Sequence, residues 1–382
     1  MASDNLARSS VVPIHDLVGA ALEAQRSDTS ASSSADDASD SDHLLIGKII
    51  ASHRDWRIDT ADPQKSVVFL SGPRAGGQLS PVSGDSQRGA PFLSAFYALS
   101  TAIEAWRRKR LVDARKEGTS EPSTFAVSVQ GVRCRVQRVQ ETRFHVRVPS
   151  PLLPLTKLGM PESLKSYLLS RELDSGGLII VCGGYGSGKT NTVNAVVRER
   201  VDRCGGYALM LGAPIEYEFS GFHGNNGSPG FVEQVDLVGM DVAAEIRASM
   251  RNFPSGATSI LGYPEIIGHQ GVGEMLRAAN RGNLVFADMH AKDLEAALLN
   301  IVSMAHQDNE EYARELLGNS LRLIVHQTMT LMPDVSRGVH VAYKHIKISR
   351  LLRTAISDTS LPLSKVITQT LGAELQASGP PR

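Results

Sequence analysis

Eight consecutive residues, Gly183 to Thr190, carry the clearest chemical signal in the sequence. They match the phosphate-binding pattern G-x-x-x-x-G-K-[ST] at every fixed position. Glycines let backbone N–H groups turn toward phosphate oxygens, and a following helix adds its positive dipole end. We expect Lys189 to reach the β- and γ-phosphates of a nucleotide and the hydroxyl of Thr190 to ligate Mg²⁺. The expected nucleotide contacts are Gly183, Gly186, Ser187, Gly188, Lys189, Thr190 and Asn191.

The neighbouring segments predict the strand–loop–helix context that this pattern requires. The apolar run 178–182 predicts a buried strand, and residues 191–203 predict a helix. Downstream, strands and helices are expected to alternate, which is typical of an α/β domain with a mainly parallel sheet. The further strands are expected at 207–211, 258–262 and 284–288, and the further helices at 241–252, 269–281 and 292–305.

The residues before this domain predict a smaller α+β domain. A helix is expected from Pro91 through Trp106, after a loop at 71–90. The basic run Arg107 to Arg110 is interpreted as a solvated helix end, with contact to nucleic acid or lipid phosphate as the alternative. Alternating apolar residues predict strands at 66–70, 125–129, 132–139 and 144–148.

Shifts in composition divide the chain into four parts. Residues 27–42 form an acidic, serine-rich stretch that cannot bury enough apolar surface to order itself. The segment Glu310 to Thr370 is expected to be mostly helical, with a strand at 339–343. We therefore predict a disordered tail at 1–43, the α+β domain at 44–149, the phosphate-binding domain with a helical C-terminal part at 150–370, and a flexible tail at 371–382.

The composition limits the classes of protein that fit. The formal net charge is zero, so no global attraction to DNA or acidic membranes is expected. No apolar run approaches the ~20 residues of a transmembrane helix, and no secretory signal is recognised. Three widely spaced cysteines fit a reducing compartment and offer no zinc-binding pair. A cytoplasmic protein is expected, with peripheral attachment to a membrane complex left open.

Several segments together resemble the secretion ATPases of type II and type IV systems, a superfamily that includes pilus-retraction motors and the Dot/Icm-like and conjugal-transfer ATPases. The resemblance runs from about Val132 to Arg353 and rests on the order and spacing of weak motifs. The matched segments are 155–161 with "LeeLGLP", 213–217 with the aspartate box "EDPIEY", 246–254 with "ALRaaLRedP", 259–265 with the Walker B segment "vILvGE", 281–290 with the histidine box "TGHLVFATLH", and 320–327 with "sLraVisQrL".

The resemblance implies roles for five residues beyond the phosphate loop. Glu265 would orient the attacking water and contribute to the metal site together with Thr190. Glu216 would help to hold Mg²⁺ or its waters, and His290 would sense the γ-phosphate. Arg133 and Arg135 would reach the nucleotide across an interface. The alternatives are a surface glutamate, a solvated acid, a structural histidine and ordinary polar strand positions, respectively.

The sequence departs from the family pattern near the metal. The aspartate box has Gly212 and Ala213 where the family has Glu and Asp. The segment Ile266 to Gln270 replaces the family's "RDxET", and the stretch before Glu265 is longer than usual. Hydrolysis is therefore expected to be slow or to use other acids, with Asp288 and Glu218 as substitutes.

The resemblance implies a RecA-like P-loop motor domain, preceded by a small PAS-like α+β domain, in a ring of six identical subunits. The expected function is binding and hydrolysis of ATP with Mg²⁺ to power a type IV secretion or conjugal DNA-transfer apparatus at the cytoplasmic side of the inner membrane. Its partners would be inner-membrane secretion or pilus proteins, with nucleic acid involved only indirectly. The alternatives are a pilus-retraction motor, a weakly catalytic nucleotide-binding regulator of a mixed ring, and a nucleic-acid translocase.

Overall fold

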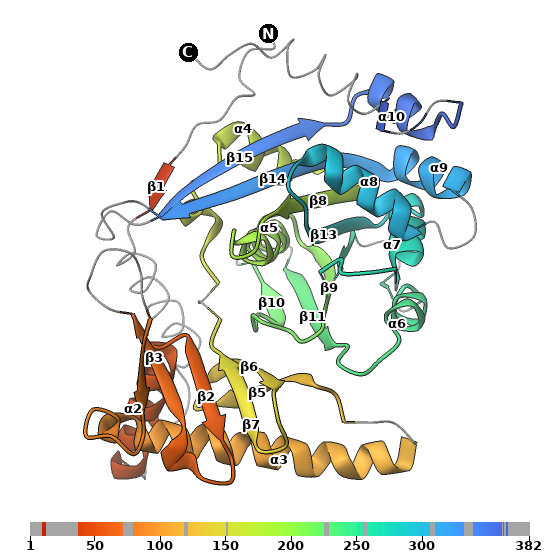
Figure 1. Cartoon of the computed structure of the whole chain (residues 1–382). Coiled ribbons are helices and arrows are strands. Elements are labelled where there is room, and N and C mark those ends of the chain that lie inside the picture. The colour runs from red at the N-terminus through yellow and green to blue at the C-terminus, as the bar shows by residue number, and fades with distance from the viewer. Residues whose placement is uncertain are drawn as a thin grey trace. The chain divides into compact units, whose positions relative to one another are not determined.

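The chain forms two compact units in a computed structural model (Figure 1). One comprises 152–212 and 219–382 together with 1–21, and the other comprises 22–151 and 213–218. The structure describes residues 10–12, 37–71, 79–117, 121–149, 152–224, 229–251, 253–254, 258–263, 265–269, 271–305, 310–331, 339–360, 362 and 364–365. The expected flexible tail at 371–382 lies outside these residues.

Within the described residues, the larger unit is built on a nine-stranded mixed sheet, in the order β1-β15-β14-β8-β13-β12-β9-β11-β10. Six neighbouring strands, from β14 to β11 in this order, run parallel, and the antiparallel strands lie at the two edges. The α/β class expected from the sequence is confirmed. The strands are β1 (Ser10–Val12), β8 (Gly177–Gly183), β9 (Gly206–Gly212), β10 (Gly221–His223), β11 (Gly230–Asp236), β12 (Ser259–Gly262), β13 (Leu284–His290), β14 (Leu321–Leu331) and β15 (Val339–Lys347).

Helices cover both faces of this sheet. On one face, apolar residues of α7, α8, α9 and α10 pack against alternate residues of β8 and β13, such as Ile180 and Val285 (Figure 1). On the other face lies α5, whose Val193, Val196 and Val197 are buried. The helices are α4 (Glu162–Leu168), α5 (Lys189–Cys204), α6 (Val242–Ser249), α7 (Val272–Asn280), α8 (Leu294–Ala305), α9 (Glu310–Ser320) and α10 (Arg350–Ser357).

In the part of the chain that the structure describes, the smaller unit is a six-stranded antiparallel sheet, in the order β4-β3-β2-β7-β6-β5, with two α-helices. Its core is aromatic: Trp56, Phe96, Phe125 and Phe144 are buried, and Trp106 stacks on Phe125 with ring centroids 3.8 Å apart. The elements are α2 (Asp37–Ala51), β2 (Asp55–Asp59), β3 (Val67–Ser71), β4 (Leu79–Ser83), α3 (Leu93–Glu117), β5 (Thr124–Val129), β6 (Val132–Arg138) and β7 (Arg143–Arg147).

Some local predictions were wrong. Strand β4 occupies part of the expected loop at 71–90, and α2 begins at Asp37, so the last residues of the expected tail are helical. The basic run Arg107 to Arg110 does not end its helix, because α3 continues to Glu117. Arg107 is held by ion pairs to Glu104 at 3.2 Å and to Glu121 at 2.7 Å. That pairing gives Arg107 a structural role inside its own unit.

The C-terminal part differs most from the expectation. The expected strand at 339–343 is the beginning of the longer β15, and the eleven-residue strand β14 precedes it. Together they form an antiparallel pair that extends the central sheet, with β14 beside the phosphate-loop strand β8. The described part of the chain holds no helix that is long and apolar enough to cross a membrane.

Candidate nucleotide-binding site

The phosphate loop lies between the central strand β8 and the start of α5, as its sequence predicts. Every residue of β8 is buried, so the strand is a rigid support for the loop. Gly188 is the N-cap of α5 with φ of 85°, a left-handed conformation that glycine adopts without strain. The first helical residue is Lys189. The helix N-terminus and the lysine therefore lie at the same edge of the sheet.

Gly183 is required by a close approach of two strands. A Cβ atom at this position would lie 2.2 Å from the carbonyl oxygen of Gln327 in β14. The end of β8 can therefore lie beside β14 only when residue 183 has no side chain. This contact explains the first glycine of the motif by packing, in addition to the freedom that it gives the loop.

Lys189 is buried at the base of the loop, with 5% of its surface exposed. Its Nζ donates to the carbonyl oxygen of Gly184 at 2.9 Å and lies 3.2 Å from Nδ1 of His290. Burial lowers the pKa of Lys189, while the negative charges of Asp288 and Glu265 act in the opposite direction. An ammonium held among such partners is suited to exchange them for phosphate oxygens.

His290, at the end of β13, joins the lysine to the expected catalytic acid. Its Nε2 lies 2.7 Å from Oε1 of Glu265. Because the ammonium of Lys189 can only donate, Nδ1 of His290 must accept, and Nε2 then carries the proton that it donates to Glu265. The three side chains form one hydrogen-bonded chain, Lys189–His290–Glu265, which we call the relay. The ring of the exposed Tyr185 lies over the imidazole, with centroids 3.6 Å apart.

The backbone around Glu265 explains how it reaches His290. The N–H of Ile266 donates to the carbonyl oxygen of Asp288 at 2.8 Å, and Ile266 forms a β-bridge with Met289. Glu265 thus follows the short strand β12 at a point where the chain is attached to β13. The sequence predicted Glu265 and His290 separately from two motifs, and the structure brings them together.

Thr190 is hydrogen-bonded to a residue that the sequence offered only as a substitute acid. Its Oγ1 donates to Oδ2 of Asp288 at 2.6 Å. Asp288 is 3% exposed and belongs to β13, directly beside the phosphate-loop strand. A hydroxyl and a carboxylate are the hard oxygen donors that Mg²⁺ prefers. These two residues therefore fit a magnesium ion that arrives with a nucleotide.

The other loop residues have mainly structural contacts. Ser187 donates through Oγ to the carbonyl oxygen of Gly184 at 2.8 Å, and Asn191 is buried in the first turn of α5. Gly186 has φ of 68°, with no atom near the place of a Cβ. Gln327, which was not predicted as a site residue, donates to the carbonyl of Ser187 at 2.6 Å. The only signal for it was its place at the end of the last family-like segment.

The remaining predicted residues lie in the smaller unit. There, Arg135 pairs with Glu216 at 3.2 Å, and Arg133 pairs with Glu218 at 2.8 Å. Arg133 also donates to the carbonyl oxygen of Ile215 at 3.1 Å. The segment after Ala213 is therefore attached to β6 by these arginines. The roles of Arg133, Arg135 and Glu216 toward a nucleotide stay predictions.

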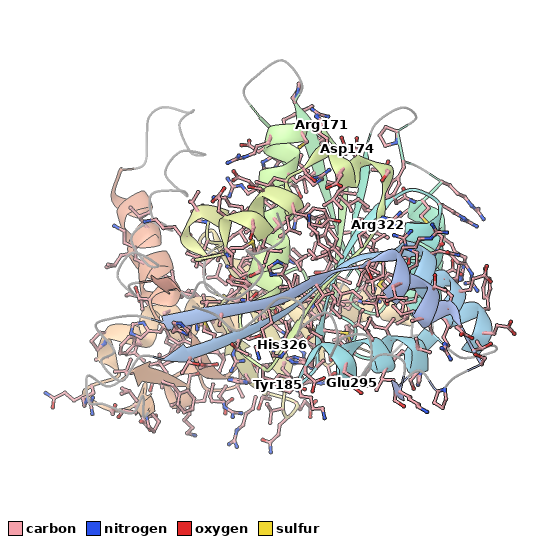
Figure 2. The ribbon with its side chains drawn as sticks, turned by 90° about the horizontal axis from the view of Figure 1, so that it is seen from above. Arg171, Asp174, Tyr185, Glu295, Arg322 and His326 are labelled. Carbon is pink, nitrogen blue, oxygen red and sulfur yellow. The ribbon has the colours of Figure 1, made fainter. Side chains whose placement is uncertain are left out.

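The site residues of the larger unit gather at one end of the sheet. Figure 2 labels Tyr185, which follows β8, and Asp174, which precedes it, at opposite ends of the unit. Within the described ranges, no group of three or more His, Cys, Asp or Glu side chains could hold a metal by itself. A magnesium ion here would need the phosphate oxygens of a nucleotide to complete its ligands, as is usual for this ion.

Solved structures resemble the fold over most of the chain. The crystal structure of the pilus retraction motor PilT with bound ADP has a TM-score of 0.62 and 22% identity, and covers 87% of this chain and 89% of that one. The ATPase DotB of Legionella pneumophila has a TM-score of 0.61 and 15% identity, covering 88% and 87%. At these identities the likeness concerns the fold alone.

Sequence comparisons identify the family. The type IV pilus ATPase PilU of Pseudomonas aeruginosa is 27% identical over 215 residues, which are 55% of this chain and 53% of PilU. The chain spans about half the length of the curated relatives that it matches first. The family model described as "Type II/IV secretion system protein" matches residues 128–358, more than half of the chain. The protein therefore belongs to the type II/IV secretion system protein family.

Proposed function

We propose that the protein is an ATPase that binds and hydrolyses ATP with Mg²⁺ to drive a type IV secretion or conjugal DNA-transfer apparatus. The relay from Lys189 through His290 to Glu265, at the N-terminus of α5, carries this proposal. The imidazole of His290 lies between the ammonium of Lys189, which would bind the phosphates, and the carboxylate of Glu265, which would orient the attacking water. ADP in the similar PilT structure supports the use of an adenine nucleotide.

The chemistry follows from the positions of these groups. Lys189 and the loop amides would bind the β- and γ-phosphates, and His290 would lose its contact with Lys189 when the γ-phosphate takes its place. His290 would then keep Glu265 in a fixed orientation, so that the carboxylate accepts a hydrogen bond from the attacking water. Mg²⁺, when bound, would neutralise developing phosphate charge. Thr190 would hold the ion from the protein side.

The first experiment compares two lysines. Lys189→Ala should abolish Mg²⁺-dependent ATP turnover, whereas Lys292→Ala, at a side chain that is 83% exposed, should leave it unchanged. Glu265→Gln should retain ATP binding and lower turnover about 100-fold or more, because the general base is lost. If the wild-type protein binds ATP but releases no phosphate, the motor function is wrong.

A second candidate function is motivated by Gly212 and Ala213, which replace two acids of the family pattern. In this case the protein is a weakly catalytic, nucleotide-binding regulator of a mixed ring. Ala213→Asp should then raise turnover several-fold, and an unchanged rate would count against this function. A pilus-retraction motor is the third candidate, supported by the similarity to the type IV pilus retraction ATPase PilT of Pseudomonas aeruginosa, which is 26% identical over 211 residues.

The assembly and the surroundings are part of the same proposal. We expect a ring of six identical subunits attached to inner-membrane secretion or pilus proteins on the cytoplasmic side, with the smaller unit as its PAS-like domain. Arg133 and Arg135 would contribute positive charge to a nucleotide across a subunit boundary. Light scattering with and without ATP measures the ring directly, and a monomer under all conditions would contradict it.

A further inference from the structure

Strand β13 presents two polar side chains to two consecutive residues of the phosphate loop. His290 contacts Lys189, and Asp288 contacts Thr190. Asp288 and His290 are two residues apart and therefore lie on one face of the strand. They pair in register with Val181 and Gly183 of β8. The end of β13 thus supplies both contacts: one to the lysine that is expected to bind phosphate, and one to the threonine hydroxyl that is expected to bind the metal.

The contact between Asp288 and Thr190 has the character of a bond to a carboxylate. Its length of 2.6 Å lies in the range of O–H···O⁻ bonds, which are shorter than neutral ones. Asp288 is almost fully buried, and a buried carboxylate is costly unless positive charge or donors surround it. Its charge also acts on Lys189, more strongly than that of Glu265 does. The acidic side chain of Asp288 therefore lies where we expect the cation of a nucleotide complex to bind.

The sequence makes this position distinctive. In the histidine box that the segment Arg281 to His290 resembles, the place of Asp288 is taken by threonine. The same chain has Gly212 and Ala213 where the family pattern has two acids. Relative to these patterns, the chain lacks carboxylates at the end of β9 and has one in β13, two strands closer to the phosphate loop.

We propose that Asp288 is the carboxylate that holds the Mg²⁺ ion of the nucleotide complex, in place of the acids missing at 212 and 213. The ion is commonly held by few protein oxygens together with phosphates and water, so one hydroxyl and one carboxylate suffice. Thr190 and Asp288 form that pair. The inference rests on the proposed nucleotide-binding function. It assigns a metal-positioning role to Asp288 and leaves orientation of the attacking water to Glu265.

The test measures ADP binding with and without a divalent cation. Asp288→Asn retains one oxygen that can accept from Thr190, removes the negative charge and replaces the other carboxylate oxygen by an NH₂ group. Wild-type protein should bind ADP in EDTA and more tightly with Mg²⁺ or Mn²⁺. The variant should bind ADP in EDTA at least as tightly as the wild type. The factor by which the cation increases ADP affinity should be at least tenfold smaller in the variant than in the wild type. Asp202→Asn, at an exposed residue of the same α5 helix, is the matched control.

The outcomes separate this inference from the function on which it rests. The role of Asp288 is overturned if the cation increases ADP affinity equally in wild type and Asp288→Asn. It is also overturned if the ADP affinity of the wild-type protein does not depend on the cation. If wild-type protein binds neither ADP nor ATP under any condition, the proposed function itself fails.

A second measurement uses the unmodified protein, in case the variant does not fold. Fe²⁺ replaces Mg²⁺ in the ADP complex, and ascorbate with peroxide then produces radicals that cleave the backbone next to the ion. Cleavage that requires ADP is expected near Thr190 and near Asp288, as mapped by mass spectrometry. Cleavage near Thr190 without cleavage near Asp288 overturns the inference.

Discussion

Gln327 and Ser187 join the long strand β14 to the phosphate loop. The side-chain Nε2 of Gln327 donates to the carbonyl oxygen of Ser187 at 2.6 Å, while its Oε1 accepts from Oγ1 of Thr192 at 2.8 Å. The side chain is 3% exposed. A single buried amide thus fixes both the loop and the first turn of α5, and its two bonds also determine which end of the amide is which.

Replacing Gln327 by leucine should therefore weaken nucleotide binding without touching a phosphate contact. Both hydrogen bonds are lost and the Ser187 carbonyl loses this donor, which costs about 1–3 kcal/mol. We expect ADP affinity to fall about 5- to 100-fold in calorimetric titrations. Thr328→Val, at the next and exposed residue of β14, is the control. Unchanged affinity in Gln327→Leu would mean that the loop keeps its shape without β14.

Arg200 is a buried anchor at the far end of α5. Its guanidinium is 0% exposed and donates to the carbonyl oxygens of Leu168 at 3.0 Å and Ser170 at 2.8 Å and to the carboxylate of Asp174. Arg200→Leu should lower the free energy of unfolding by about 2–4 kcal/mol, because buried acceptors lose a charged donor. The measurement is urea denaturation followed by circular dichroism.

The matched control is Arg203→Leu, one turn later on α5. Arg203 is 54% exposed and pairs with Glu199, so its loss should cost under about 1 kcal/mol. The combination of Arg200→Leu with Asp174→Asn should cost less than the sum of the single changes. If Arg200→Leu and Arg203→Leu lower the free energy of unfolding equally, Arg200 is not an anchor of α5.

Stability should fall as the pH is lowered toward 5. Burial lowers the pKa of His345, with Lys347 acting in the same direction, and burial also lowers the pKa of His326. The unfolded chain takes up protons near a pKa of about 6.5, before the folded protein does. Below that pH the unfolded state binds more protons, so the free energy of unfolding decreases.

His345→Gln should make this decrease less steep between pH 7 and pH 5. The measurement is chemical denaturation at each pH, with His340→Gln as the control for removing an imidazole from β15. If His345→Gln and the wild-type protein lose stability in parallel, protonation of His345 does not contribute.

The three cysteines should differ in reactivity. Burial raises the pKa of Cys134 and of Cys182 to about 12, so at pH 8 on the order of one thiol in ten thousand is ionised. Cys204 is only half-buried and should react with iodoacetamide first, as read by mass spectrometry of peptides. All three should react equally in urea. Rapid modification of Cys182 in the folded protein would show that β8 opens readily.

The phosphate loop and its flanking elements were predictable because their signals are local. The glycine, lysine and threonine positions of the motif are typical of a phosphate loop at a strand–helix junction, and the apolar run before them is typical of a buried parallel strand. The alternation of elements up to α8 was predictable for the same reason, except for β10 and β11, which were not predicted. Strand β14 was not, since its residues also fit a helix-rich segment and become a strand by pairing with β8 and β15.

By itself, the sequence predicted the α/β class and the phosphate loop, and it singled out Lys189, Thr190, Glu265 and His290 as candidate site residues. Only the tertiary structure decided that Lys189, His290 and Glu265 form one relay, that Asp288 meets Thr190, and that Gln327 supports the loop. The reason is that spacing along the chain fixes which residues share a strand or a helix. Which strand ends meet is fixed by the order of pairing across the sheet, and that order depends on contacts between residues about a hundred positions apart.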